Sequence, residues 1–269
     1  MTTRTFAGYS IMRMLGDGGM TRLLLALDEQ GQRVVLRYLQ EEYARRWRYR
    51  RHFMQGAKVL TQLHHPNIVQ LIKTGQEGHI PYMVLEYVEA CSLRELLLNR
   101  DPLLVRQALP MIRQLAAVLA YVHGAGYMHL DLKPENILVQ KDGSVYIIDF
   151  DLAQKRRWHP FRLWELPGTP AYIAPETLLR HEVDERSDIY GLGVVFYEML
   201  TFHKPYEGTH IDQVRADHVN PAVPPTRPRQ HDAHIPVDLE TIILKCIAKQ
   251  PEDRYPSISL VIRDLEALI

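Results

Sequence analysis

The sequence predicts an α+β protein with two lobes, a small β-rich lobe followed by a larger helical one. The first 90 residues contain short β-prone runs, such as TRLLLALD (21–28) and QRVVLRYL (32–39), separated by the turn signals GDGG and DEQGQ. From Ser92 onward the apolar residues recur at helical spacing. With 269 residues, the chain is long enough for each lobe to bury a core of its own.

We expect the first lobe at about residues 1–87, a connecting segment at about 86–91 and the second lobe at about 92–269. A helix is expected at about Trp47–Leu63. The strands expected in the first lobe are YSIMRML (9–15), the two runs named above, Ile68–Ile72 and Pro81–Glu86.

Helical patterns dominate the second lobe. SLRE (92–95) is a capping box that starts a helix, with Ser92 as N-cap and Glu95 three residues later. Apolar residues at helical spacing predict an amphipathic helix up to His123, with Pro110 in its first turn or at a kink. The segment 188–201 is apolar on nearly every side, which is typical of a helix buried at the centre of a domain. The other expected elements are a hairpin (137–139 with 145–148), a proline-rich connector (220–230) and two terminal helices (239–249 and 259–269).

Composition and charge exclude several classes of protein. Lys and Arg together number 32, as do Asp and Glu, so the total charge predicts neither nucleic-acid nor membrane binding. Cys91 and Cys246 lie far apart without metal-ligand spacing, which indicates a reducing compartment. No apolar run approaches the roughly 18 residues that span a bilayer, and the N-terminus has no signal-peptide pattern. We therefore expect a cytoplasmic protein, whole or as the soluble part of a longer chain.

The segment HLDLKPENILV (129–139) has the residue types that phosphoryl transfer requires. Such transfer depends mainly on positioning and charge neutralisation. Asp131 can accept the proton of a substrate hydroxyl, Lys133 can steady the γ-phosphate and Asn136 can bind a metal ion. Asp149, at the end of the apolar strand in IIDFD, supplies a second metal ligand. A polar turn before a proline explains the first segment alone, but not the acid that follows.

LGDGGM (15–20) lies between two expected strands, where glycine lets the backbone approach a phosphate closely. Alone, this segment fits a hairpin turn better than a phosphate loop. Together with GTPAYIAPE (168–176) and SDIYGLG (187–193), the motifs resemble those of the eukaryotic-like (Hanks-type) Ser/Thr protein kinases, especially the bacterial branch. The resemblance covers essentially the whole chain and implies a bilobal kinase-like fold that binds ATP with Mg²⁺ or Mn²⁺.

The resemblance also implies roles for individual residues. It makes Asp131 the catalytic base, Lys133 and Arg37 the phosphate contacts, and Asn136 and Asp149 the metal ligands. It implies a structural ion pair between Glu176 and Arg254, and an anchor for the catalytic loop at Asp188. The residues that it places around the nucleotide are Gly16, Gly18, Leu23, Val35, Glu86, Val88 and Leu138.

Four residues depart from the family pattern, namely Arg37, Gly56, Leu130 and Asp151. Arg37 replaces a lysine that holds the α- and β-phosphates, and Gly56 replaces the glutamate that pairs with that lysine. Arginine keeps the charge but is longer, planar and forked, so the exchange is not conservative. Asp151 replaces a glycine and either pairs with Arg37 or adds a ligand for metal. Relaxed drift in an unused site explains these changes equally well.

Leu130 replaces an arginine that binds a phosphate on the activation loop. The corresponding loop here, 152–166, contains no Ser, Thr or Tyr. The phosphate acceptor and its receptor are therefore missing together, and the segment is expected to be fixed or set by a partner. The basic and aromatic runs 45–51 and 155–164 favour a solvated face or an acidic protein partner over nucleic acid, because the whole chain is neutral.

Two functions fit the sequence. The changes at Arg37, Gly56, Leu130 and Asp151 favour a pseudokinase or very weakly active Ser/Thr kinase that binds ATP and acts as a regulatory or scaffold module. The complete set of Asp131, Lys133, Asn136, Asp149 and Thr169 favours an active atypical Ser/Thr kinase with Arg37 in place of the lysine. A scaffold without nucleotide is a weaker alternative, because its metal ligands would have no use. The expected partners are a nucleotide and a protein partner or substrate.

Overall fold

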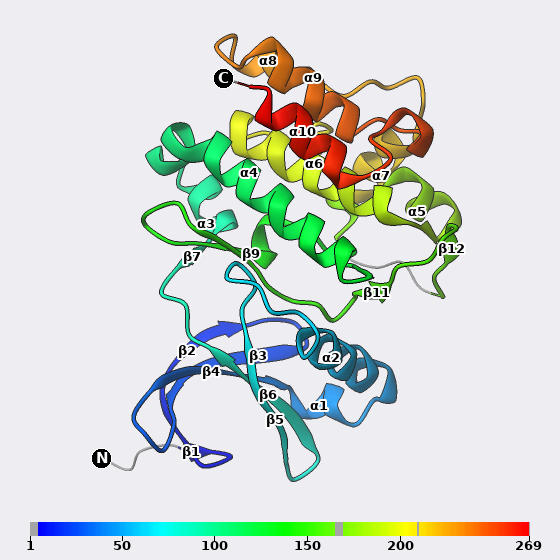
Figure 1. The fold of residues 1–269 in the computed structure, drawn as a ribbon. Helices are drawn as coiled ribbons and strands as arrows, with labels where there is room; N and C mark the ends of the chain where they lie inside the picture. The colour runs from blue at the N-terminus through cyan, green and yellow to red at the C-terminus, as the bar shows by residue number, and fades with distance from the viewer. Residues whose placement is uncertain (1–4, 165–168, 209, 269) are drawn as a thin grey trace. The chain divides into compact units, whose positions relative to one another are not determined.

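The computed structural model describes residues 5–164, 169–208 and 210–268 (Figure 1). The chain divides into two units. The N-terminal unit is Met1–Glu89 with Asp149–Asp151, and the C-terminal unit is Ala90–Ile148 with Leu152–Ile269. The first unit is built around a sheet and the second mainly from helices. The predicted α+β class, with a small β-rich part and a larger helical part, is confirmed.

The strands described in the N-terminal unit form one six-stranded antiparallel sheet in the order β1-β2-β3-β4-β6-β5. Their bounds are β1 (Thr5–Phe6), β2 (Tyr9–Asp17), β3 (Thr21–Leu27), β4 (Arg33–Leu39), β5 (Leu71–Glu77) and β6 (Ile80–Glu86). Alternate residues of β3 and β4, namely Leu24, Ala26, Val34 and Leu36, are buried together in one cluster. This alternation is the reason that these segments form strands with one buried face.

The other face of β4 packs against helix α2 (Trp47–Leu60), which follows the short helix α1 (Glu41–Ala44). Leu39 lies in a second buried cluster with Phe53 and Ala57 of α2. Arg37 precedes Leu39 by two residues, so both side chains leave the sheet on the same side. The pleat of β4 therefore directs the Arg37 side chain toward the helix.

The largest differences from the prediction in this unit are found at one strand and one helix. The strand predicted at Ile68–Ile72 is found at Leu71–Glu77. Ile68 is buried although it lies before the strand, whereas most β5 residues are exposed, so burial there does not follow the strand. Helix α2 ends at Leu60 rather than Leu63, because the apolar pattern continues into the buried turn beyond the helix.

The C-terminal unit is mainly helical. Its helices are α3 (Leu93–Leu98), α4 (Pro102–Gly124), α5 (Pro175–Arg180), α6 (Glu185–Thr201), α7 (Ile211–Val219), α8 (Pro228–His231), α9 (Val237–Cys246) and α10 (Ile258–Glu266). Its short strands are β7 (Cys91–Ser92), β8 (Tyr127–Met128), β9 (Ile137–Val139), β10 (Val145–Ile147), β11 (Gln154–Lys155), β12 (Phe161–Arg162) and β13 (Glu182–Val183). The predicted hairpin of β9 and β10 and the capping box of Ser92 and Glu95 are both confirmed.

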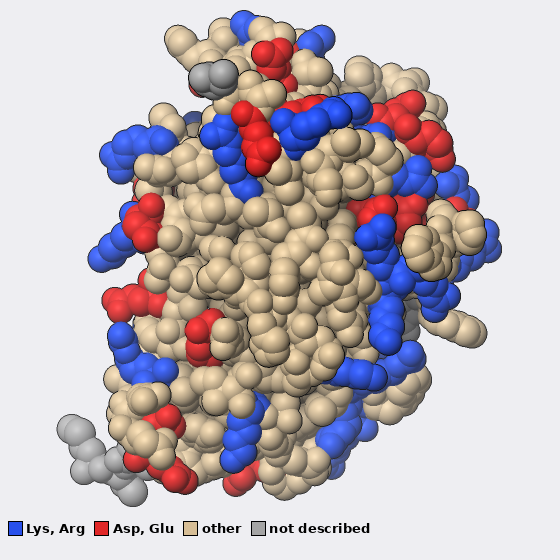
Figure 2. Space-filling model, in the orientation of Figure 1, with Lys and Arg blue, Asp and Glu red and all other residues tan. Residues whose placement is uncertain are grey.

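Helix α6 is the centre of this unit, as predicted from its apolar surface. It packs against α4 and α9, and α4 also packs against α10 (Figure 1). A side-chain carbon added at Gly193 would lie 2.6 Å from Cβ of Cys246 and 2.8 Å from Cγ2 of Ile247. Glycine at this position therefore lets the end of α9 approach α6 closely. Around α10, basic and acidic side chains lie side by side (Figure 2), as in the 2.7 Å pair of Arg263 and Asp264.

Helix α4 is longer than predicted. It starts at Pro102, where Asp101 caps it by accepting a hydrogen bond of 2.8 Å from the Leu103 N–H, and it continues through Pro110. Pro110 therefore does not lie in the first turn. By length and composition alone, α4 is also apolar enough to cross a membrane, which the sequence analysis missed because polar residues interrupt the run. Its buried face, including Met111 and Leu115, is that of a helix in a protein core.

The buried His218 of α7 should make the stability of the fold depend on pH. Its Nδ1 lies 2.7 Å from the Tyr190 hydroxyl, and burial lowers the pKa of His218 from 6.5 to about 4. Because the unfolded chain binds the proton more readily, the free energy of unfolding is unaffected above about pH 6.5 and falls as the pH drops through about 4. The full loss corresponds to about 3 kcal/mol. We expect that in His218→Asn the free energy of unfolding in urea, measured at several pH values, depends less on pH between about 6.5 and 4. The exposed His159→Asn is the control, and an unchanged slope in His218→Asn contradicts the prediction.

Candidate active site

The segment from His129 to Asn136 leads from β8 to β9 and is anchored by Asp188 of α6. Asp188 accepts backbone hydrogen bonds from His129 (2.8 Å) and Leu130 (2.7 Å), and its Oδ2 lies 2.8 Å from Nε2 of His123. Leu130 has a φ of 62°, a conformation that is costly for a residue with a branched side chain. The two backbone bonds to Asp188 hold this strained turn in place. The predicted role of Asp188 as anchor is confirmed.

Asp188 remains ionised although it is buried. Burial favours the neutral carboxyl group, but the hydrogen bond from His123 and the backbone N–H groups outweigh this effect, so the pKa of Asp188 is lowered. The anchor is therefore a buried negative charge that is balanced by donors from two elements. Such a charge is stable only while its partners stay in place.

The ring of His129 connects this segment to the end of β10. Its Nδ1 accepts a hydrogen bond of 3.2 Å from the Asp131 N–H, so its Nε2 carries the proton and donates to the Ile148 carbonyl at 3.1 Å. The backbone of Asp131 is thus fixed from one side by His129. A fixed backbone of this kind suits the role predicted for Asp131, which depends on precise positioning.

Asp131, Lys133 and Asn136 meet in one hydrogen-bonded group. Lys133 Nζ lies 2.9 Å from Oδ2 of Asp131, and Asn136 Nδ2 donates to the same oxygen at 2.8 Å and to the Asp131 carbonyl at 2.9 Å. Because the amide nitrogen of Asn136 is used on Asp131, the amide oxygen is the atom that can bind a metal ion. The three side chains are therefore held in a fixed arrangement around one carboxylate.

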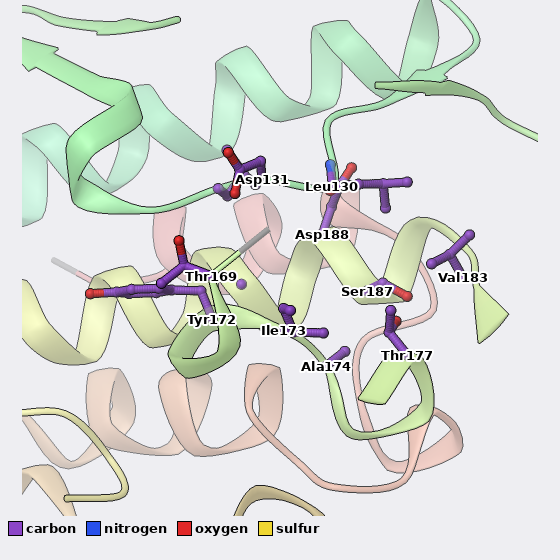
Figure 3. Close-up of a pocket in the computed structure, with 12 residues that line it drawn as sticks. Leu130, Asp131, Thr169, Tyr172, Ile173, Ala174, Thr177, Val183, Ser187 and Asp188 are labelled. Carbon is purple, nitrogen blue, oxygen red and sulfur yellow. The ribbon is translucent and has the colours of Figure 1, made fainter. Parts of the chain in front are cut away.

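Asp131 also lines a small pocket together with Thr169, Tyr172 and Ser187 (Figure 3). The pocket has a volume of about 20 Å³, room for roughly one water molecule. It is too small for a nucleotide. Thr169 and Asp131 line the same pocket, so the hydroxyl that marks Ser/Thr kinases in the sequence lies on a surface shared with the proposed base.

The second group of site residues lies in the N-terminal unit around Arg37. Its guanidinium makes a bidentate pair with Asp151, Nη1 to Oδ1 and Nη2 to Oδ2, both at 2.8 Å. Nη2 also donates to Oδ1 of Asp149 at 3.2 Å, and the Asp151 N–H donates to the same oxygen at 3.3 Å. Of the two roles proposed for Asp151, pairing with Arg37 is confirmed.

Arg37 is almost completely buried, with 8% of its surface exposed. Burial by itself favours loss of the proton, but Asp149 and Asp151 outweigh it and raise the pKa of Arg37. Helix α2 contributes the ring of Phe53, whose centroid lies 5.4 Å from Cζ of Arg37. The guanidinium is therefore a permanent buried cation, held by two carboxylates and an aromatic face.

The glycine-containing segment after β2 forms a tight turn into β3. Gly18 donates its N–H to the Thr21 carbonyl at 3.1 Å, and Gly16, which still belongs to β2, pairs with Leu23 next to a register shift. Gln40, just after β4, donates to the Gly18 carbonyl at 2.8 Å and to Asp17 at 3.1 Å. The turn is thus tied to the strand that carries Arg37.

The other residues predicted around a nucleotide lie in both units. Leu23 pairs with Arg37 in the sheet, and Val35 is buried two residues earlier in β4. Glu86 donates its backbone N–H to the Gln70 carbonyl at 3.0 Å, so that donor is already used. The half-buried Val88 follows in the N-terminal unit, whereas the half-buried Leu138 belongs to β9 of the C-terminal unit.

Asn136 and Asp149 fit a hard cation by the chemistry of their donors. An amide oxygen and a carboxylate are oxygen ligands of the kind that Mg²⁺ prefers. No group of three or more His, Cys, Asp or Glu that could hold a metal occurs among the residues that the structure describes. Mg²⁺ held by so few protein ligands usually keeps several waters and binds substrate phosphates as further ligands. At Asp149 a cation would also share Oδ1 with Arg37.

The activation segment is held by backbone pairing in the part that the structure describes. Strand β11 pairs with β8 and β12 pairs with β13. Arg156 donates its N–H to the Gly126 carbonyl at 2.8 Å, and its side chain lies 3.0 Å from Glu185. These contacts need no phosphate, as expected from the lack of an acceptor. Trp158 and Trp164 are 96% and 98% exposed, and residues 165–166 of the predicted loop lie outside the described residues.

The predicted ion pair of Glu176 and Arg254 is confirmed. Nη2 of Arg254 lies 2.6 Å from Oε2 of Glu176, Nη1 lies 2.9 Å from Oε1, and both side chains are buried. Arg254 also donates to the carbonyls of Arg186 and Ala248. The pair thus fixes the start of α5 to the first turn of α6 and to the segment between α9 and α10.

Arg94 of α3 is a connecting residue that the sequence analysis missed. It donates to Glu135, beside Asn136, at 2.8 Å, and to Glu198 of α6 at 2.6 Å, and it bonds the Tyr172 hydroxyl. Burial and Glu198 raise the pKa of Tyr172, so this hydroxyl stays protonated. No spacing in the sequence indicates this contact, because its members lie on four separate elements.

Comparison with known proteins gives a family for this geometry. The family model described as the protein kinase domain matches residues 9–264. A probable serine/threonine-protein kinase of Streptomyces coelicolor is 33% identical over 269 residues, with 97% of this chain and 40% of the relative covered.

Two other relatives lead to the same family. The serine/threonine-protein kinase PknB of Mycobacterium leprae is 33% identical over 96% of this chain and 42% of its own length. The serine/threonine-protein kinase PrkC of Bacillus subtilis is 33% identical over 92% of this chain and 38% of its own length. The chain therefore spans about two fifths of the length of these relatives.

Replacing Asp188 by Asn should weaken the fold and release the segment that carries Asp131. The variant keeps the size of the side chain but removes the charge that three donors share. We expect a loss of about 3 kcal/mol in the free energy of unfolding in urea. The exposed Asp238→Asn is the control and should change stability by less than about 0.5 kcal/mol. Equal stabilities of the two variants contradict the anchoring role.

Proposed function

Because the chain belongs to the protein kinase domain family, we propose that it binds ATP with Mg²⁺ and transfers the γ-phosphate much more slowly than an ordinary kinase. In this role it is close to a pseudokinase and acts mainly as a regulatory or scaffold module for protein partners. The observation that carries the proposal is the position of Arg37, which makes three hydrogen bonds to Asp149 and Asp151.

These three bonds use three of the five N–H donors of the guanidinium. The charge that would stabilise the phosphates is therefore partly neutralised by carboxylates. Catalysis of phosphoryl transfer relies on positioning and on such charge stabilisation. Losing one preorganised contact of this kind costs about 100- to 1000-fold in rate. Binding is retained, because two N–H donors and a buried positive charge remain in place.

The C-terminal unit supplies the groups for the transfer itself. Asp131 would accept the hydroxyl proton of a Ser or Thr side chain, and its carboxylate is already oriented by Lys133 and Asn136. Lys133 would move from Asp131 onto the γ-phosphate, where its charge is needed. Asn136 and Asp149 would hold Mg²⁺, which when bound neutralises the phosphate oxygens. The nucleotide would contact Gly16, Gly18, Leu23, Val35, Glu86, Val88 and Leu138.

A second function, an active atypical Ser/Thr kinase, is favoured by one observation. Lys133 and Asn136 are already hydrogen-bonded to the Asp131 carboxylate, so no rearrangement of Asp131 is needed before a hydroxyl arrives. In this case Arg37, held by Asp151, does the work of the lysine. The names of the relatives support serine and threonine as the acceptor residues. We place the domain in the cytoplasm, where ATP is present and the free thiols Cys91 and Cys246 remain reduced.

Transfer of labelled phosphate from ATP tests the proposal and separates the two functions. The purified protein is incubated with Mg²⁺ and then Mn²⁺, with itself and a generic basic protein as acceptors. We expect turnover about 100- to 1000-fold below the 1–100 s⁻¹ that is typical of kinases. Asp131→Asn sets the blank, and Asp142→Asn, in an exposed turn, is the matched control.

Turnover in the ordinary range contradicts the slow-kinase proposal and establishes the atypical active kinase. If calorimetry shows that ATP binds but phosphate transfer is no greater than with Asp131→Asn, only the pseudokinase role remains. Absence of ATP binding in folded protein, judged by its thermal transition, overturns both functions.

A further inference from the structure

Gly56 lies in α2, facing the segment that carries Asp151. A Cβ atom added at Gly56 would lie 2.2 Å from Oδ1 of Asp151, and 3.1 Å from both its Cα and its backbone nitrogen. The first distance is far shorter than any real contact between these atom types. No side chain, not even that of alanine, therefore fits at position 56 while Asp151 keeps its place.

The same oxygen of Asp151 accepts the 2.8 Å hydrogen bond from Nη1 of Arg37. Phe53, which lies 5.4 Å from Cζ of the guanidinium, precedes Gly56 by three residues and so lies on the same face of α2. On one face of α2, the ring of Phe53 thus packs near the Arg37 guanidinium, and the missing side chain of Gly56 leaves room for the Asp151 carboxylate. Asp151 therefore lies against Gly56 on one side and is hydrogen-bonded to Arg37 on the other.

We infer that Asp151 is the positioning residue for Arg37, and that Gly56 is required because it makes room for the Asp151 carboxylate. The three departures from the family pattern are then one coupled exchange, in which the carboxylate partner moves from α2 to the segment 149–151. The number of charges is preserved, with one cation and one anion. Relaxed drift at three independent positions would not produce this steric fit.

The exchange also explains why the cation is arginine. Asp151 binds both Nη atoms at 2.8 Å, which requires the planar fork of a guanidinium. A lysine ammonium has no second nitrogen for such a pair. By holding two donors, Asp151 limits Arg37 to one bond with Asp149. Asp151 therefore keeps Asp149 accessible to Mg²⁺, a consequence that rests on the function proposed above.

The steric coupling is tested by thermal unfolding of the 269-residue chain without nucleotide. Alanine is favoured over glycine inside helices, so Gly124→Ala at the exposed end of α4, where a Cβ meets nothing within 4 Å, should leave Tm unchanged or raise it by about 2 °C. We expect Gly56→Ala to lower Tm by about 5 °C or more, because the new methyl group displaces Asp151 from Arg37.

Removal of the Asp151 side chain should cancel the effect of the methyl group. In the Asp151→Gly background, Gly56→Ala is expected to change Tm by less than about 2 °C, since only the 3.1 Å backbone contacts remain to be relaxed. An equal loss of Tm in both backgrounds overturns the coupling. A rise in Tm on Gly56→Ala alone overturns it as well.

The positioning role is tested by binding of a non-hydrolysable ATP analogue with Mg²⁺ and with EDTA. Asp151→Asn keeps the shape of the side chain but loses its charge, so Arg37 shifts onto Asp149. We expect the gain in affinity that Mg²⁺ gives to shrink about tenfold, with affinity in EDTA little changed. Arg33→Ala, an exposed arginine on the same strand, is the control.

The two readouts separate this inference from the proposed function. An unchanged Mg²⁺ effect in Asp151→Asn overturns the positioning role of Asp151. Failure of the unmodified protein to bind the analogue overturns the proposed function and, with it, the metal consequence. The thermal measurements still decide the coupling of Gly56 and Asp151 in that case, because they need no ligand.

Discussion

The buried guanidinium of Arg37 is the constraint around which the N-terminal unit is organised. A charged group that is removed from water must be paired, and breaking such a pair costs about 3–5 kcal/mol. Strand β4 directs this cation toward α2, but α2 has no carboxylate at the facing position and offers Phe53 and Gly56 instead. The counter-charge comes from Asp149 and Asp151. This explains why residues 149–151 belong to the N-terminal unit, although the residues before and after them in the sequence do not.

The C-terminal unit also contains a buried charge that needs partners, but this charge is negative. Asp188 is a buried anion, and its partners are His123 and the backbone of His129 and Leu130. These bonds hold Leu130 in a left-handed conformation, and the turn places Asp131 beside Lys133 and Asn136. An arginine at position 130 is not needed for this geometry, since the backbone N–H and not the side chain binds Asp188. Leucine at this position therefore lacks the phosphate-binding side chain expected from the family pattern, but the support of the loop is kept.

Much of the site could be predicted from short spacings along the chain, because such spacings determine which groups one turn or strand end brings together. Asp131, Lys133 and Asn136 are an example, and so is the capping box of Ser92 and Glu95. Contacts between distant segments were harder to predict. The pair of Arg37 and Asp151 was one of two roles considered, and the fit of Gly56 against Asp151 leaves no periodic signal in the sequence. Boundaries were wrong where burial and regular structure do not coincide, as at β5 and at the end of α2.

The departures from the family pattern therefore differ in kind from simple loss. A decayed site would lose its charges or leave them without partners, whereas here each buried charge has a partner at hydrogen-bonding distance. Arg37 is bound to Asp149 and Asp151, and in the proposed function it would have to bind the phosphates of ATP as well. A cation that is held firmly by carboxylates is well placed to bind phosphates, but it stabilises the negative charge of the transition state less strongly. Under the proposed function, the same contacts that stabilise this unit would therefore limit the rate of phosphoryl transfer.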